Sequence, residues 1–96
     1  FLNAKNMLIR DEHFGEGSTS EAAIYPREVI RRALDLGASS LILVHNHPSG
    51  DPSPSKQDIA VTRDIAEVGK RLGIQLHDHV IIGARGHASL RALGLI

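Results

Sequence analysis

Two histidines, His45 and His47, stand one residue apart in the stretch HNHPSGDPSPSKQD, and Asp58 closes it. In an extended segment alternate side chains point to the same face, so the two imidazoles lie side by side while Asn46 points away. Two ring nitrogens can then share one metal ion. Catalytic zinc sites use three protein ligands and leave a position for water, and Asp58 is the best candidate for the third ligand. The spacing leaves one alternative open, an exposed or hydrogen-bonded histidine pair on a strand.

The elements on either side of the histidines can bring these ligands together. Residues 40–44, SLILV, form a continuous apolar run that is typical of a strand buried on both faces, and they lead directly to His45. The proline-rich residues 48–54 are expected to turn the chain back stiffly, which limits the ordering cost of about 1–2 kcal/mol per flexible residue. Ser55 or Ser53 then caps a helix, and Asp58 lies in its first turn, where the helix dipole favours a carboxylate.

The rest of the chain predicts an α/β domain with a mixed β-sheet flanked by helices. Pro26 suits a first helical position, an apolar stripe follows it, and Gly37 ends this helix. Gly73 ends the second helix. We expect strands at residues 1–10, around 12–17, and at 22–25, 40–44, 74–83 and 87–90. Strands that alternate with helices are typical of a sheet covered by helices.

Composition limits both the fold and the chemistry. With 96 residues, 42% of them hydrophobic, the chain is predicted to be one domain, residues 1–96, with a single core. It contains no cysteine, so a metal must be held by His, Asp or Glu. Eleven basic and eleven acidic residues cancel, which argues against a domain whose main task is to grip a phosphate backbone. We interpret Arg27, Arg31 and Arg32 as a solvated helix face.

Other features of the sequence concern location and completeness. No apolar run approaches the ~20 residues of a membrane span, and no signal peptide is recognisable, so we expect a cytoplasmic protein. The chain begins at Phe1 inside an apolar segment and without an initiator methionine. We therefore expect the first strand to be cut.

The metal-ligand pattern resembles a known signature. His45-x-His47-Pro48, seven residues between His47 and Ser55, and two between Ser55 and Asp58 resemble the JAMM motif of the MPN-domain metalloproteases. The segment HNHPSGDPSPS, with YPREV upstream and HDHVIIG downstream, is similar to the bacterial RadC family, formerly described as DNA repair proteins. The similarity extends over essentially the whole chain. One departure is Asn46, where JAMM proteases outside the RadC family commonly carry Ser or Thr.

The resemblance implies a site, an activity and a fold. It implies Zn2+ held by His45, His47 and Asp58, and it implies that Ser55 helps to stabilise the oxyanion during hydrolysis of a peptide or isopeptide bond in a peptide or protein substrate. The alternative role of Ser55 is that of a helix N-cap, and the two roles are compatible. The fold implied is the MPN domain, which resembles that of the cytidine deaminases.

The general base of the JAMM peptidases is a glutamate on an early strand. In the RadC family the equivalent residue lies a few positions before the Phe-Leu pair, so we expect it N-terminal to Phe1. Glu12 and Glu16 are the nearest substitutes, and we interpret both as exposed. The prediction is that this chain binds zinc and has little or no hydrolase activity.

The other histidines of the chain are expected to have structural or surface positions. His77 and His79 alternate on a predicted strand and are expected in the core or beside the metal ligands rather than at a second site. His13 and His87 are expected at the surface.

The alternative function is a non-catalytic module that associates with DNA repair or with another protein. A zinc deaminase is disfavoured, because the chain has no cysteine ligands.

Overall fold

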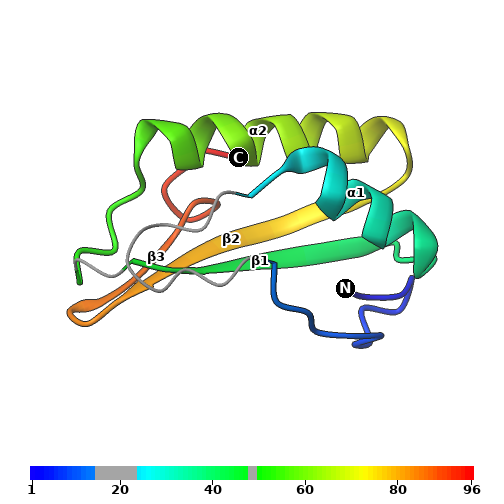
Figure 1. Cartoon of the computed structure of the whole chain (residues 1–96), viewed down its shortest axis with the longest axis horizontal. Coiled ribbons are helices and arrows are strands. Elements are labelled where there is room, and N and C mark those ends of the chain that lie inside the picture. The colour runs from blue at the N-terminus through cyan, green and yellow to red at the C-terminus, as the bar shows by residue number, and fades with distance from the viewer. Residues whose placement is uncertain (15–23, 48–49) are drawn as a thin grey trace.

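Two helices and three strands follow one another in the part of the chain that the computed structural model describes, residues 1–14, 24–47 and 50–96 (Figure 1). Their order is α1 (Pro26–Asp35), β1 (Ser40–Asn46), α2 (Lys56–Arg71), β2 (Gln75–Gly83) and β3 (Gly86–Ser89). This order confirms the α/β class predicted from the sequence. None of the helices in these ranges is long and apolar enough to cross a membrane.

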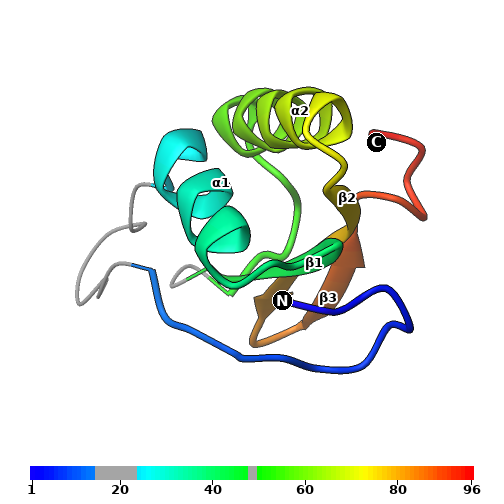
Figure 2. The same ribbon diagram turned by 90° about the vertical axis from the view of Figure 1, so that its right-hand side faces the viewer.

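The strands form a mixed sheet in the order β1-β2-β3. β1 runs parallel to β2, with His45 opposite Ile81, and β2 runs antiparallel to β3, with Ile81 opposite Ala88. Both helices lie on one face of this sheet, and residues 1–14 run past the other face (Figure 2). The helices therefore protect one side of β1 and β2, and a side chain on that side is held between layers.

Local chemistry explains where the helices begin and end. α1 begins at Pro26, whose missing N–H costs nothing at the first helical position. α2 begins after Ser55, which caps it, and the left-handed φ of Gly73, +75°, lets the chain leave the helix after Leu72. The predictions for Pro26, Ser55 and Gly73 are confirmed.

The core lies between the helices and the sheet. Its buried side chains are aliphatic, as the scarcity of aromatic residues requires. They come from both helices, from β1 and β2, and from the turns that lead into these two strands: Val29, Ile30, Ala33, Ala38, Leu41, Leu43, Ile65, Ile74 and Leu76. The α2 residue Ile65 is completely buried. This layer fixes the distance between α2 and the sheet, and with it the place of the first turn of α2.

Some predicted strand features are wrong. Ile42 and Val44 are 47% and 61% exposed, so β1 is not buried on both faces, because the helices cover one face alone. Leu2 makes isolated bridges to Leu8 and Ser40 where a strand was predicted over residues 1–10. The strands predicted around 12–17 and at 22–25 fall largely on residues 15–23, outside the described residues, and Ile24 and Tyr25 are not in a strand.

Candidate metal centre

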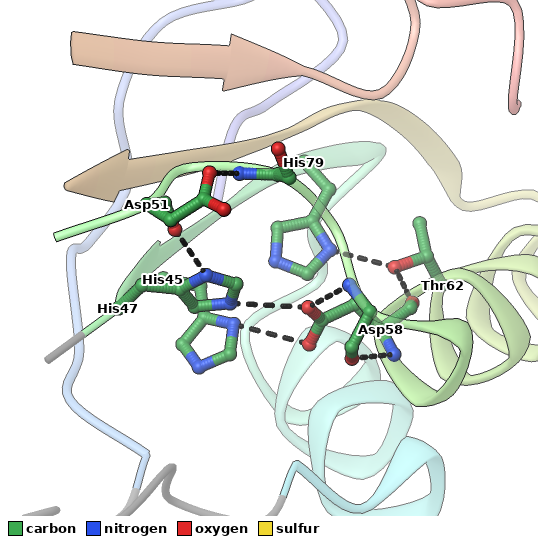
Figure 3. A network of polar contacts seen from close by, with 8 residues as sticks. His45, His47, Asp51, Asp58, Thr62 and His79 are labelled. Carbon is green, nitrogen blue, oxygen red and sulfur yellow. Dashed lines mark hydrogen bonds and ion pairs between the residues drawn. The ribbon is translucent and has the colours of Figure 1, made fainter. Parts of the chain in front are cut away.

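The three predicted ligands lie together where β1 ends and α2 begins (Figure 3). One ligand atom from each of His45, His47 and Asp58 lies within 4.8 Å of the other two. Their exposed fractions are 9%, 8% and 7%. The alternation predicted from the sequence is present, since Asn46 is exposed between two buried histidines. The three residues singled out by their spacing in the sequence therefore form a cluster in the fold.

Asp58 is placed by the cap of α2. Its backbone N–H donates to Ser55 Oγ over 3.0 Å, and its Oδ2 accepts the Ser55 N–H over 2.8 Å, so the two residues form a capping box. The carboxylate is thereby turned back toward the start of the helix and the histidines. Ser55 thus has the N-cap role that the sequence left open beside the catalytic one.

His47 is placed by the loop that returns from β1 to α2. Its backbone N–H donates to Ile82 O of β2, and its carbonyl accepts the Gly50 N–H. Its ring Nδ1 lies 2.8 Å from the backbone carbonyl of Asp51. A carbonyl can only accept, so Nδ1 carries the hydrogen and the Nε2 lone pair of the neutral ring is directed to the cluster. This hydrogen bond is the arrangement expected of a metal-ligating histidine.

The donor set fits a divalent cation. His47 Nε2 lies 3.1 Å from Asp58 Oδ2, and His45 Nδ1 lies 3.3 Å from Asp58 Oδ1. Tetrahedral zinc with bonds of about 2.0–2.1 Å separates its ligand atoms by about 3.4 Å. Both ring nitrogens of His45 are buried and form no hydrogen bond within the described ranges. A cation among these atoms would satisfy a buried nitrogen and the facing carboxylate together.

The carboxylate of Asp58 is held in its charged form. Burial raises the pKa of this group, but the hydrogen bonds from Ser55 and the neighbouring His45 and His47 outweigh that effect and lower it. Asp58 is therefore an anion at neutral pH. An anion beside two imidazoles is a set of ligands that a zinc ion can use without first displacing a proton from the carboxyl group.

A fourth buried side chain, His79 of β2, lies beside the cluster. Its ring is 28° from parallel to that of His45, with centroids 5.9 Å apart, and its Nδ1 lies 2.6 Å from the Thr62 hydroxyl of α2. Burial lowers the pKa of His79 to about 4, and the neighbouring His45 acts in the same direction. The prediction that His79 lies in the core beside the ligands is confirmed. His77 instead faces Asn6 Oδ1 at the surface.

Thr62 and the Asp51 carbonyl were missed by sequence reasoning. Thr62 follows Asp58 by one helical turn, which is a usable signal, because residues four apart share a helix face. The Asp51 contact is made by a backbone atom, which side-chain identity does not reveal.

The candidate base Glu12 is engaged elsewhere. Both of its carboxylate oxygens accept the Arg32 Nε hydrogen over 2.8 Å, and the guanidinium of Arg32 lowers the pKa of Glu12. Glu16 lies outside the described residues. His13 and His87 are exposed as predicted. Within residues 1–14, 24–47 and 50–96, the cluster of His45, His47 and Asp58 is the one group of His, Cys, Asp and Glu side chains spaced to hold a metal.

A comparison with protein families agrees with this geometry. The family model described as the RadC-like JAB domain matches residues 1–95, which is nearly the whole chain. The match includes both histidines, Asp58 and the helix cap between them.

Proposed function

Because the chain belongs to the RadC-like JAB domain family, we propose that it is a zinc-dependent hydrolase that cleaves a peptide or isopeptide bond. The observation that carries the proposal is the buried group of His45, His47 and Asp58, with ligand atoms within 4.8 Å of one another. Cysteine is absent and the carboxylate is anionic, so the ligands are the nitrogen and oxygen donors typical of catalytic rather than structural zinc.

The chemistry divides between the ion and the chain. When bound, zinc lowers the pKa of a water molecule to about 7 and polarises the carbonyl under attack. The chain holds the ligands: Asp51 orients the His47 ring through its carbonyl, and Ser55 orients Asp58 through the capping box. Ser55 Oγ accepts the Asp58 N–H, so its own hydroxyl hydrogen is available to donate. Donated to a carbonyl oxygen that gains negative charge, that hydrogen would stabilise the transition state.

The proposed base is not among the described glutamates. Glu12 is paired with Arg32 and does not belong to the cluster. Glu16 lies outside the described residues. The proposal takes the position of the base from the sequence resemblance, which puts it N-terminal to Phe1. A version of the protein extended upstream of Phe1 is expected to hydrolyse substrate faster than residues 1–96 alone.

The test is a cleavage assay on a complex peptide library, read by mass spectrometry, with isopeptide-linked peptides added. The zinc-loaded extended protein is compared with the same protein after chelation, with His45→Ala, and with His87→Ala as a control for an exposed histidine. We expect cleavage that is lost on chelation and in His45→Ala, and retained in His87→Ala. Zinc binding without cleavage of any substrate would refute the hydrolase and favour a non-catalytic module.

A further inference from the structure

Thr62 and His79 form a polar pair inside the domain, directly behind the metal ligands. Their exposed fractions are 0% and 1%. Thr62 Oγ1 donates its one hydrogen to the Asp58 carbonyl over 2.5 Å. The contact of 2.6 Å with His79 Nδ1 must then be an N–H donated by His79 to the same oxygen. The two hydrogen bonds therefore fix which nitrogen of His79 carries the hydrogen.

The pair connects elements that carry different ligands. Thr62 is tied to the turn of α2 that holds Asp58, and His79 belongs to β2 and lies against the His45 ring of β1. In Figure 3 the Nε2 edge of His79 faces the two ligand histidines. One pair thus contacts two of the three ligand residues, Asp58 through a hydrogen bond to its carbonyl and His45 through its ring.

Hydrophobic packing alone does not explain a polar pair at this buried position. Burying a hydroxyl and an imidazole is favourable only where their polar atoms are satisfied, and two aliphatic side chains would fill the same space without that requirement. His79 Nε2 is buried and makes no hydrogen bond within the described part of the chain. The surrounding core is otherwise aliphatic. A directed polar connection at this place needs a reason other than hydrophobic burial.

The geometry points to Thr62 and His79 as positioning residues of the metal centre, which set the spacing between the Asp58 turn and the His45 ring. This inference rests on the proposed function, since it requires that His45, His47 and Asp58 bind a metal. Removing the Thr62 hydroxyl breaks the connection between α2 and β2 while it leaves every ligand in the chain. Residues that support metal ligands in this way typically change affinity by about 10–100-fold when they are altered.

The experiment measures the affinity of the chain for Zn2+ by competition with a chromophoric chelator, and records the visible absorption of the Co2+ form. Thr62→Val removes the hydroxyl at nearly constant volume, and Thr62→Ser keeps it. His79→Asn keeps a donor for Thr62 but removes the ring edge that faces His45. Ile65→Val is the control, because Ile65 is a fully buried α2 residue whose side chain has no polar atom.

We expect Thr62→Val and His79→Asn to weaken zinc binding by about 10-fold or more and to change the Co2+ spectrum. Thr62→Ser and Ile65→Val should bind within about threefold of the original chain. Circular dichroism of the metal-free proteins identifies the folded variants, and His79→Asn decides if Thr62→Val does not fold.

Two results would overturn parts of this scheme separately. Original affinity and an original Co2+ spectrum in the folded variants would refute the positioning role while the metal site stands. Absence of zinc binding by the original chain would instead refute the proposed function itself.

Discussion

The close approach of Gly83 to the loop after β1 gives a sharp prediction. A Cβ at position 83 would lie 2.2 Å from the Gly50 carbonyl oxygen and 2.7 Å from its carbon, both of which are backbone atoms. To restore an ordinary van der Waals distance to this Cβ, the loop has to move away from position 83 by about 1 Å. Asp51 follows Gly50 directly, and its carbonyl holds the His47 ring at 2.8 Å. A shift of that size lengthens this contact beyond a hydrogen bond.

Gly83→Ala is therefore expected to lower stability by about 1–3 kcal/mol through overpacking and to weaken zinc binding by about 10–100-fold through His47. The matched control is Gly69→Ala. Its Cβ would lie 2.6 Å from the Ile74 carbonyl oxygen, so it also overpacks against backbone. Gly69 lies about 16 Å along α2 from Asp58, far from the cluster.

The assay is urea unfolding of both variants without metal, followed by chelator competition for Zn2+ on the folded proteins. Both variants should lose stability, and Gly83→Ala alone should lose affinity. Original affinity in Gly83→Ala would refute the link from the loop to His47. Equal losses of affinity in the two variants would show that general destabilisation, and not the position of the Asp51 carbonyl, governs binding.

Three further predictions follow from other contacts. Ser55→Ala removes the N-cap of α2 and should lower stability by about 1 kcal/mol in urea unfolding. If the Ser55 hydroxyl stabilises an oxyanion, the same substitution should also slow peptide hydrolysis by about 10²–10³-fold. Unchanged turnover would exclude that catalytic role. Burial raises the pKa of Asp78, but the hydrogen bonds from Ser89, Arg91 and His79 outweigh burial and lower this pKa. The Asp78 carboxylate therefore contributes to stability above pH 3.8, and this contribution is lost as the pH falls through the lowered pKa of the folded protein. Asp78→Asn should thus cost about 1–3 kcal/mol at pH 7 and clearly less near pH 2, and an equal cost at both pH values in urea unfolding would contradict this assignment. Fluorescence titration with duplex DNA should show no steep dependence of affinity on salt, because the net charge is zero and Glu12 pairs with Arg32. A slope of log affinity against log salt concentration that corresponds to the release of several ions would instead favour the DNA-associated alternative.

The site could be predicted from the sequence because its geometry is local. Alternation along a strand places His45 and His47 on one face, and the first turn of a capped helix places Asp58, so short-range periodicity predicts the face on which each ligand lies. The loop between them is short, and it limits how far apart the two elements can lie. The order of helices and strands after Pro26 was predictable for the same reason.

The features of the fold and the site that the sequence did not predict depend on contacts between distant parts of the chain. The apolar run of β1 did not reveal that Ile42 and Val44 would be exposed, since a hydrophobic pattern does not tell how many layers cover a sheet. The approach of Gly83 to Gly50 arises where the end of β2 meets a loop 33 positions earlier in the chain. The hydrogen bond between Thr62 and His79 likewise joins a helix to a strand, so it can be recognised only once the packing of α2 on β2 is known.

The central claim is that His45, His47 and Asp58 hold one zinc ion. Its most direct test is elemental analysis after equilibrium dialysis against Zn2+, on the original chain and on His45→Ala, His47→Ala and Asp58→Asn, with His87→Ala as the control. We predict one zinc ion per chain in the original protein and in His87→Ala, and a loss of stoichiometric zinc in each ligand variant. Stoichiometric zinc in all three ligand variants, or none in the original chain, would contradict the claim.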